Sequence, residues 1–235
     1  MRSFVEMNVF IAQITGAIAE LTAEESWHCV KVLRCKAGEK INVIDGNGNF
    51  YEGELTEVNE KKCIAKITSP AKKQTPRNYY LHLGIAPTKN IDRIEWLIEK
   101  AVEIGIDEIS FIRCKNSERT VIKTDRLQKI AESAVKQSLQ AFIPKINSLI
   151  GFEKIIKTES DIKLIAHCFP ETKKTLNDFD LKNKKSLVLI GPEGDFTPAE
   201  VQLAIANKFE PLNLGNNRLR TETAGLYVCN AFALL

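Results

Sequence analysis

The sequence predicts an α/β protein made of a small β-barrel and a larger domain with a parallel sheet. Segments rich in β-branched residues surround one short helical segment in about the first 70 residues, which favours a small barrel. A polar stretch with two prolines, S-P-A-K-K-Q-T-P-R-N at residues 69–78, has the composition of a linker. Beyond it, strands alternate with helices, which indicates a parallel sheet covered on both faces. We therefore predict domains at residues 1–73 and 74–235.

The first domain is expected to hold strands and one helix. The strands are expected at residues 9–14, 39–44, 50–58 and 63–68. D-G-N-G at residues 45–48 is a strong turn signal, because glycine and asparagine tolerate positive φ, so the strands on either side should pair. T-A-E-E at residues 22–25 is a capping box, with Thr22 as the N-cap and Glu25 reaching back to it. The helix that it opens should run through Leu33.

The second domain is expected to alternate between strands and helices. The strands are expected at residues 79–86, 107–113, 161–168, 186–190 and 209–214. The helices are expected at residues 91–104, 124–140, 197–206 and 221–235. A second capping box, T-P-A-E at residues 197–200, opens one of these helices, with proline at its first position.

Composition limits the classes of function. The net charge of +3 permits an anionic partner without demanding one. The six cysteines form no C-x-x-C pair, and the three histidines show no ligand spacing, so we expect free thiols and no metal site. The N-terminus M-R-S-F-V-E-M lacks a long apolar run, and the other apolar runs have the length of strands. We therefore expect a cytoplasmic protein that does not span a membrane.

Two loops after strands have unusual compositions, at the sheet edge where parallel α/β proteins bind ligands. G-P-E-G-D at residues 191–195 lets backbone amides approach a ligand, although a sharp turn alone would need the same glycines. It matches neither G-x-G-x-x-G nor G-K-[ST], so a nucleoside-triphosphate site has no support. R-L-R-T-E-T at residues 218–223 is, taken alone, as well explained by a basic turn and a helix cap.

Taken together, these loops carry a family resemblance. L-I-G-P-E-G-x-F-T-x-x-E, followed by L-G-x-x-x-L-R-T-E-T-A, resembles the ribosomal RNA small-subunit methyltransferase E family of the SPOUT class. H-C-V-K-V-L-R at residues 28–34, I-E-K-A-V-E-I-G-I at 98–106 and N-S-E-R at 116–119 resemble further motifs of that family, in the same order. V-K-Q-S-L-Q-A-F-I-P-K-I at residues 135–146 is a weaker match. The resemblance covers nearly the whole chain.

The resemblance implies a fold and an activity. The fold would be a PUA-like or OB-like barrel, which helps to bind RNA, followed by a SPOUT domain whose C-terminal segment forms a deep trefoil knot. The protein would be a homodimer, with the exposed apolar side chains Leu226, Tyr227, Phe232 and Leu235 of the last helix suited to the interface. It would use S-adenosylmethionine to methylate N3 of one uridine near the 3′ end of 16S ribosomal RNA.

Carried over position by position, the resemblance also implies the residues of the cofactor site. They are Leu164, His167, Ile190, Gly191, Pro192, Glu193, Gly194, Leu214, Gly215, Leu219, Arg220, Thr223 and Ala224. Adenine needs an apolar slot with backbone partners, which Ile190, Leu214 and Leu219 suit. Residues 164–168, which end another expected strand, are expected to complete the pocket. His167 is better explained as a packed residue at a strand end than as a catalyst.

For the chemistry, the proton on the uracil nitrogen must leave as the methyl group arrives. Arg220 is a candidate for stabilising the anion that forms across N3 and the carbonyl oxygens. Glu222 is a candidate for accepting the proton or orienting Arg220, and Glu193 is a further carboxylate candidate. An alternative explanation of Glu222 is an acidic residue favoured by the helix dipole.

RNA binding would fall to basic residues outside the pocket, although each is also explained as a solvated surface charge. The candidates are Arg2, Lys31, Arg34, Lys89, Arg93, Arg119 and Lys136. The sequence departs from the family pattern in several places. Asp195 stands where the family usually has glycine. Asn217 takes the place of its usual arginine, with Arg218 following, and Lys136 and Gln140 replace its usual glutamate and arginine. Two other functions stay open: a SPOUT enzyme acting on tRNA or a ribose 2′-hydroxyl, and a noncatalytic RNA-binding relative.

Overall fold

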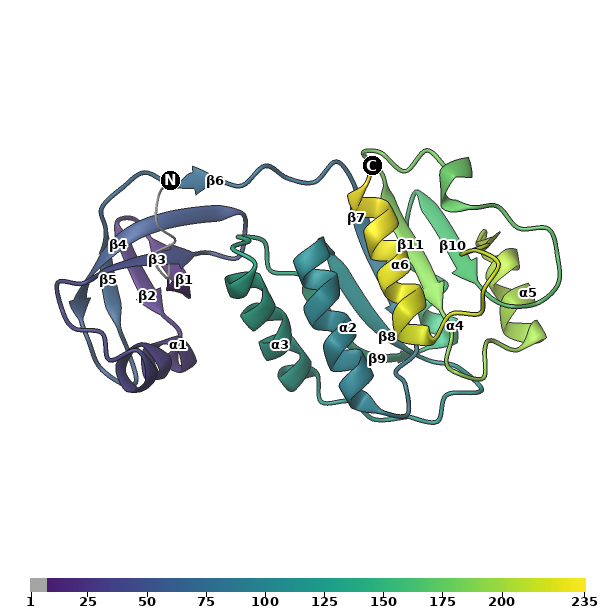
Figure 1. The fold of residues 1–235 in the computed structure, drawn as a ribbon, viewed down its shortest axis with the longest axis horizontal. Coiled ribbons are helices and arrows are strands. Elements are labelled where there is room, and N and C mark those ends of the chain that lie inside the picture. Colours follow the sequence, from purple (N-terminus) through teal and green to yellow (C-terminus); the bar gives the residue numbers. More distant parts are fainter. Residues whose placement is uncertain (1–7) are drawn as a thin grey trace. The chain divides into compact units, whose positions relative to one another are not determined.

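The computed structural model describes residues 8–235, which form two compact units (Figure 1). The first unit comprises residues up to Pro76 together with Val135–Ile143. The second comprises Arg77–Ala134 and Pro144–Leu235. Residues 135–143 are separated in sequence from the rest of the first unit. The two units are therefore not two continuous ranges of the chain.

The first unit is a closed β-barrel. Its strands are β1 (Val9–Thr15), β2 (Ile18–Leu21), β3 (Lys40–Ile44), β4 (Asn49–Glu57), β5 (Ile64–Ile67) and β6 (Lys72–Lys73). They run in the order β3-β1-β2-β5-β4-β6, and β3 also pairs with β4. This second pairing closes the first five strands on themselves and leaves the short β6 on one edge. The predicted barrel is therefore confirmed, including the pairing of β3 with β4 across D-G-N-G.

Alternate residues of the strands face the interior of the barrel, and one short helical segment packs against it through Cys29. Residues two apart on a strand face the same side, so every second residue of a barrel strand points inward. The almost fully buried side chains include Phe10 of β1, Val43 of β3 and Leu55 of β4. The helical segment starts as α1 (Ala23–Trp27), where the Thr22 hydroxyl accepts a hydrogen bond from the Glu25 amide at 3.2 Å, so the predicted N-cap is confirmed. The Glu25 carboxylate, which was expected to reach back to Thr22, pairs with Lys136. It continues as a π-helix over His28–Val32.

The second unit is built on a parallel sheet. Its strands are β7 (Tyr80–Ile85), β8 (Glu108–Arg113), β9 (Lys145–Gly151), β10 (Ile162–Ala166), β11 (Lys185–Ile190) and β12 (Glu210–Leu212). The order is β12-β10-β11-β7-β8-β9, and every neighbouring pair is parallel. All carboxyl ends therefore lie along one edge, and central strands such as β7 and β11 are apolar because both faces are covered.

Helices cover both faces of this sheet. They are α2 (Ile91–Ile104), α3 (Thr124–Gln137), α4 (Phe152–Ile155), α5 (Pro198–Ala206) and α6 (Thr221–Ala233), with a 3₁₀ turn at Leu176–Asp178. Gly225 of α6 packs against Leu83 of β7 and Leu97 of α2, so α2 and α6 share one face. Residues of α4 and α5 join the buried cluster on the other face, toward which Gly84 of β7 points.

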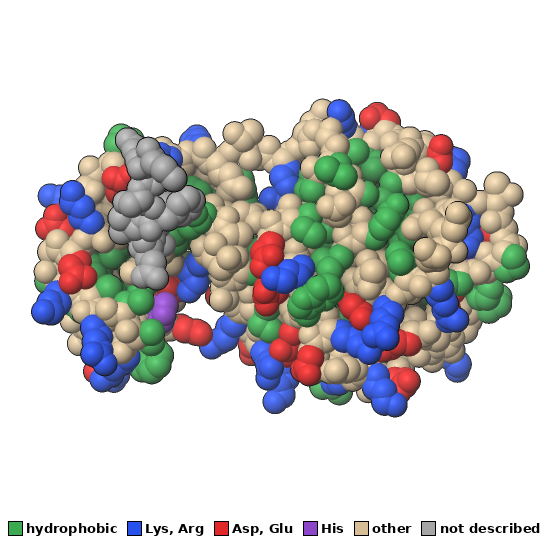
Figure 2. All heavy atoms as spheres, viewed as in Figure 1, with side chains coloured by type: hydrophobic (Ala, Val, Ile, Leu, Met, Phe, Trp, Pro, Cys, Tyr) green, Lys and Arg blue, Asp and Glu red, His purple; other side chains and the backbone are tan. Residues whose placement is uncertain are grey.

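The face of α2 and α6 exposes large apolar side chains. Figure 2 shows hydrophobic side chains over this part of the second unit. Trp96 of α2 is 47% exposed and Tyr227 of α6 is 49% exposed. Phe232 was expected to be exposed, but it is fully buried and packs edge-on against Tyr79. That expectation was wrong because Phe232 lies on the side of α6 that faces the sheet.

The chain reverses its direction across the sheet between β12 and α6. β12 lies at the outer edge next to β10, whereas α6 packs against the central strands β7 and β11. Residues 213–220 therefore cross the carboxyl edge of the sheet (Figure 1). This return path is compatible with the trefoil knot, and the threading itself stays a prediction.

Candidate functional site

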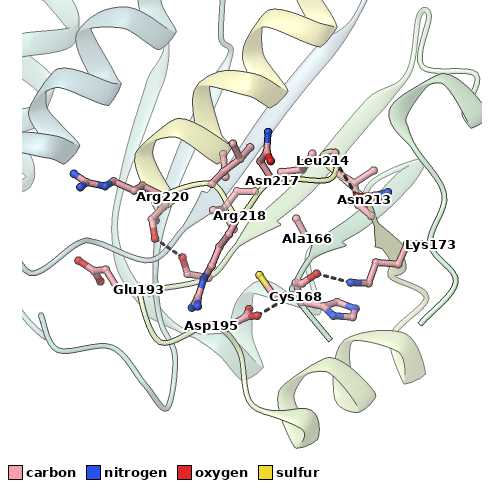
Figure 3. A pocket seen from close by; sticks show the side chains of 18 of the residues that line it. Ala166, Cys168, Lys173, Glu193, Asp195, Asn213, Leu214, Asn217, Arg218 and Arg220 are labelled. Atoms are coloured by element: carbon pink, nitrogen blue, oxygen red, sulfur yellow. Dashed lines mark hydrogen bonds between the residues drawn. The ribbon is translucent and has the colours of Figure 1, made fainter. Parts of the chain in front are cut away.

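A cavity of about 580 Å³ opens at the carboxyl edge of the parallel sheet. It lies where β10, β11 and β12 end and where α6 begins (Figure 3). Its lining residues are Ala166, His167, Cys168, Lys173, Ile190, Gly191, Pro192, Glu193, Asp195, residues 212–221 and Ala224. The volume is within the range of ligand sites, roughly 300–1,000 Å³. The loops that the sequence singled out thus meet at one place.

The G-P-E-G-D loop is shaped by close packing behind it. A Cβ atom on Gly191 would lie 3.1 Å from the ring of Phe196, so the turn leaves little room for a side chain. The Gly191 carbonyl accepts a hydrogen bond from the buried Thr221 hydroxyl at 3.1 Å. This bond ties the end of β11 to the first residue of α6, and it explains why one threonine of R-T-E-T is buried.

A second set of contacts fixes Glu193. Its Oε1 accepts a hydrogen bond from the Lys89 backbone amide at 2.9 Å. The Arg119 guanidinium donates to the carbonyls of Thr88, at 3.0 Å, and of Lys89. The loop after β8 therefore holds the loop after β7, which in turn holds the Glu193 carboxylate at the cavity.

Residues 213–220 form the opposite wall. Leu214 and Leu219 are half-buried and give this wall apolar surface, whereas Arg218 and Arg220 are exposed. Figure 3 shows Arg218 extending toward Asp195, whereas Arg220 extends in another direction. Gly215 has a φ of +117°, which favours glycine. The wall thus combines apolar and cationic groups.

The end of β10 closes the cavity. The His167 side chain is fully buried, with Nε2 2.8 Å from Glu171 Oε1 and the ring packed against Phe169. Burial lowers the pKa of His167, so the ring is neutral near pH 7. The Lys173 ammonium donates to the His167 carbonyl. The packed, noncatalytic explanation of His167 therefore fits its surroundings.

Most of the predicted cofactor residues line this cavity, and three do not. Those that do are His167, Ile190, Gly191, Pro192, Glu193, Leu214, Gly215, Leu219, Arg220 and Ala224. Leu164 is fully buried inside β10, where it cannot reach a ligand. Gly194 lies beside Asn116, and Thr223 is an exposed residue in the first turn of α6. These three predicted contacts are not part of the cavity wall.

Glu222 occupies an unexpected environment. It is buried and absent from the cavity lining, whereas its neighbour Arg220 lines the cavity. Its Oε1 lies 3.8 Å from Arg93 Nη1 of α2, and its Oε2 is buried without a hydrogen-bond partner. A carboxylate buried in this way is unusual, because an unpaired buried acceptor costs free energy. Glu222 lies behind the cavity and not at its surface.

The RNA-binding candidates of the first unit have different surroundings. Lys31 pairs with Glu60 at 2.7 Å, and both side chains are about half exposed. Arg34 is exposed and has a φ of 56°, which is uncommon for a residue with a side chain. Lys136 is largely buried and pairs with Glu25. Lys136 thus has a structural role in the first unit, whereas Arg34 is open to a ligand.

The candidates of the second unit also differ. Lys89 is exposed and pairs with Glu118 at 2.9 Å. Arg93 is half-buried beside Glu222, and Arg119 is engaged by backbone carbonyls. Arg2 lies outside the described residues 8–235. Among these residues, Lys89 is the more accessible to RNA.

Several cavity residues were not predicted. They are Lys173, Asp195, Leu212, Asn213, Asn216, Asn217, Arg218 and Thr221. Lys173 follows β10 in a loop of ordinary composition, so no local signal identifies it. The asparagines and Arg218 lie within the predicted loop, and the continuity of that loop around the cavity is the signal that would have included them.

The chain matches two family models that account for both units. A model described as RNA methyltransferase domain matches residues 75–233. A model described as RNA methyltransferase PUA domain matches residues 21–68. With a ligand-sized cavity at the carboxyl edge of the second unit, the chain is of the class of RNA methyltransferases with an N-terminal PUA domain.

Individual proteins narrow this class. Ribosomal RNA small subunit methyltransferase E of Mesomycoplasma hyopneumoniae is 31% identical over 206 residues, covering 85% of this chain and 87% of that protein. The chain belongs to the ribosomal RNA small subunit methyltransferase E family. A crystal structure of a probable rRNA-methyltransferase from Porphyromonas gingivalis is 38% identical, with a TM-score of 0.86 over 97% of both chains.

A structure of a family member with cofactor is also similar. Ribosomal RNA small subunit methyltransferase E from Neisseria gonorrhoeae, bound to S-adenosyl methionine, is 26% identical, with a TM-score of 0.82 over 97% of both chains. The cavity residues of this chain fit that cofactor. Ile190, Leu214 and Leu219 give an apolar slot, while Arg218 offers a positive charge to its carboxylate.

The described residues were also considered as metal ligands and as membrane-spanning segments. Within residues 8–235, no group of His, Cys, Asp and Glu side chains is arranged to hold a metal ion. Among the helices of the same range, none is long and apolar enough to cross a membrane.

Proposed function

We propose that this chain transfers a methyl group from S-adenosylmethionine to N3 of a uridine near the 3′ end of 16S ribosomal RNA. The observation that carries the proposal is the convergence of G-P-E-G-D and L-G-N-N-R-L-R-T-E-T-A on one cavity at the carboxyl edge of the sheet. The motifs of the family are thus assembled into a site of cofactor size. The names of the relatives support the ribosomal substrate.

The residues of the chain have separable tasks in this reaction. The cofactor, when bound, supplies an activated methyl group on a sulfonium, so the protein supplies alignment and electrostatics. Arg220 lines the cavity and is exposed to an incoming base. Its guanidinium suits the stabilisation of the anion that spreads over N3 and the uracil carbonyl oxygens as the proton leaves.

The two carboxylates have different geometries for proton handling. Glu193 lines the cavity, and its Oε1 is occupied by the Lys89 amide, which leaves Oε2 to face a substrate. Glu222 is buried behind the cavity near Arg93. Glu222 was considered for accepting the proton or for orienting Arg220. The cation beside it is Arg93 at 3.8 Å, so orienting this arginine fits its placement better than direct proton acceptance.

The test of the proposed function uses ribosomes that lack the modification. Small subunits from a strain with its uridine-N3 methyltransferase deleted are incubated with the purified chain and radiolabelled S-adenosylmethionine. Mass spectrometry of nucleosides is expected to show 3-methyluridine, and mass spectrometry of nuclease fragments is expected to place it near the 3′ end of 16S ribosomal RNA. Label in tRNA or as a 2′-O-methyl nucleoside would instead support another SPOUT activity, and cofactor binding without transfer would support a noncatalytic relative.

The role of Glu222 is tested by Glu222→Gln in single-turnover methyl transfer, with cofactor binding measured alongside. We expect a slower transfer step with nearly unchanged cofactor affinity, because Glu222 is not on the cavity surface. A wild-type single-turnover rate would remove Glu222 from the chemistry.

Assembly and location are part of the same proposal. We propose a homodimer that uses the α2 and α6 face, since Trp96 and Tyr227 are about half exposed on two helices that pack together. We also propose a cytoplasmic location, which suits a ribosomal substrate and six unpaired cysteines. A chain that elutes as a monomer on gel filtration and has full methyl-transfer activity would contradict the homodimer.

A further inference from the structure

We propose that Asp195 is a positioning residue that fastens the loops of the cofactor cavity to one another. The proposal rests on the proposed function, because it assigns a purpose to one wall of the same cavity. Asp195 lines the cavity, and its contacts reach the loops after β8, β10 and β11.

The backbone of Asp195 is in a conformation that usually belongs to glycine. Its φ is +62°, and its amide donates to the Pro192 carbonyl at 2.9 Å to close a tight turn. A residue with a side chain is rarely held in this region unless the surrounding structure compensates. Glycine would form the turn with less strain, so the turn alone does not explain an aspartate.

The carboxylate supplies what glycine cannot. Asp195 Oδ2 accepts a hydrogen bond from the Cys168 amide at 2.8 Å, and Oδ1 accepts one from the Phe196 amide at 2.7 Å. The first bond crosses from the loop after β11 to the loop after β10. A bond from a backbone amide to a carboxylate is stronger than one between neutral groups. It therefore holds the Cys168 backbone at the cavity wall.

The other side of the same turn is held by the loop after β8. Asn116 Nδ2 donates to the carbonyls of Gly194 and Asp195, each at 3.1 Å. A Cβ atom on Gly194 would lie 3.2 Å from the Asn116 Cβ, so the two loops are in close contact. Asp195 is thus held through its backbone from one loop and reaches a second loop with its side chain.

These contacts set the shape of the cavity before a ligand binds. Both residues of the Asp195–Cys168 bond line the cavity, and next to it Lys173 holds the His167 carbonyl. Without the carboxylate, the Cys168 amide loses its partner and the loop that starts at His167 gains freedom. Cofactor binding would then include the cost of ordering that loop, which lowers affinity.

The test compares Asp195→Asn with Asp195→Gly. Asparagine keeps an acceptor oxygen and tolerates positive φ, whereas glycine keeps the turn and removes the acceptor. Calorimetric titration with S-adenosylmethionine is expected to give D195N a Kd within about threefold of wild type and D195G a Kd about tenfold weaker. Under saturating cofactor, kcat of D195G is expected to recover while its KM for cofactor stays raised.

Two outcomes would overturn the proposal. If D195G binds S-adenosylmethionine as tightly as wild type, the hydrogen bonds of the carboxylate have no effect on cofactor affinity. If D195N binds as weakly as D195G while its Cys168 amide stays protected from hydrogen exchange, the negative charge acts on the ligand and the hydrogen bond is not the cause. Thermal unfolding of both variants shows whether a loss of affinity is a loss of fold.

Hydrogen exchange separates this proposal from the proposed function. In the wild-type chain without ligand, the Cys168 amide is expected to be protected, and D195G is expected to exchange it at least tenfold faster. An unprotected Cys168 amide in the wild-type chain overturns the proposal even if D195G does not fold. Absence of S-adenosylmethionine binding by a wild-type chain with a protected Cys168 amide would contradict the proposed function and leave the loop contact established.

Discussion

The two edges of the parallel sheet both carry charged and polar side chains, but they are arranged in opposite ways. At the carboxyl edge, polar groups surround a cavity of about 580 Å³. At the amino edge, a network of polar side chains on β7, β8 and β9 consists of Tyr80, His82, Glu108, Ser110 and Asn147, and we call it the amino-edge network. His82, Glu108 and Ser110 are buried, whereas Tyr80 is 36% exposed.

Most polar side-chain atoms of the amino-edge network contact one another, while the buried His82 Nδ1 has no hydrogen-bond partner. Glu108 accepts hydrogen bonds from Asn147 at 2.7 Å and from the Tyr80 hydroxyl at 3.0 Å. His82 Nε2 lies 2.8 Å from the Ser110 hydroxyl, and its Nδ1 lies 3.8 Å from Glu108. Ser110 contacts His82, which lies near Glu108, and this order of residue types is that of a catalytic triad. Ser110 and His82 are each only 2% exposed, so a substrate does not reach them.

The two edges differ in whether their polar groups are available to a ligand. The carboxyl edge has glycine-containing loops, exposed Arg218 and Arg220, and space for a ligand. In the amino-edge network, side chains face side chains, and its contacts stabilise the sheet. Substitutions at the amino edge should therefore change stability, and substitutions at the carboxyl edge should change activity.

The largest effect is expected for Glu108→Ala. The change leaves the Tyr80 hydroxyl and the Asn147 amide without their acceptor, and it should lower the free energy of unfolding by about 4 kcal/mol. Chemical denaturation measures the loss, and Glu108→Gln is the matched control, since it keeps one acceptor oxygen. Unchanged stability combined with weaker cofactor binding would break the distinction between the edges.

The pH dependence of stability should come in part from His82. Burial lowers the pKa of His82 to about 4, against 6.5 for an exposed histidine. Below pH 6.5 the unfolded chain takes up a proton that the folded chain does not, so this contribution is present above pH 6.5 and is lost as the pH falls to about 4. The loss should reach about 3 kcal/mol.

Denaturation of the wild-type chain and of His82→Gln at several pH values isolates this effect. The difference in stability between the two should change between pH 6.5 and pH 4 and stay constant above pH 7. A constant difference over the whole range would show that His82 has no depressed pKa.

At the carboxyl edge, Arg220→Ala should reduce single-turnover methyl transfer about a hundredfold, which corresponds to about 2.7 kcal/mol. The free energy of unfolding should change by less than about 0.5 kcal/mol, because the Arg220 side chain is exposed. Arg220→Lys serves as the control: it keeps the charge and loses the planar guanidinium, so an intermediate rate is expected. A drop in stability as large as that of Glu108→Ala would assign Arg220 to the structural side of the comparison.

The smallest effect is expected for Thr197→Ala, just after the G-P-E-G-D loop. The Thr197 hydroxyl accepts a hydrogen bond from the Glu200 amide at 3.2 Å, and the Glu200 carboxylate accepts one from the Thr197 amide at 2.8 Å. Loss of this cap should lower the free energy of unfolding by about 1 kcal/mol. Thr197→Ser should restore it, and equal losses in both variants would contradict a capping role.

The sequence predicted the regular elements that have strong local signals. Strands such as β11 are continuous apolar runs, and α5 begins at a capping box, so both appear where expected. The strands β2, β6 and β9 and the short helix α4 were missed. β2 is short, and β9 has the mixed sequence K-I-N-S-L-I-G and is a strand because β8 lies beside it.

The site was predictable where it is made of continuous motifs. Residues 191–193 and most of 214–220 line the cavity because each follows a strand whose end lies on the same edge. Lys173 and the bond from Cys168 to Asp195 depend on β10 lying between β11 and β12, which no local pattern shows. Arg119 seemed a surface charge because a sequence does not show that a guanidinium faces backbone carbonyls.

The position of Cys168 has a practical consequence. It is the one exposed cysteine and it lines the cavity, while Cys29, Cys63, Cys114 and Cys229 are buried and Cys35 is half-buried. A thiol-selective dye should therefore attach first at the cavity mouth, under mildly alkaline conditions, since burial and Asp195 raise the pKa of Cys168. A ligand in the cavity would slow the labelling, so the protein carries a built-in reporter for screening compounds that occupy it.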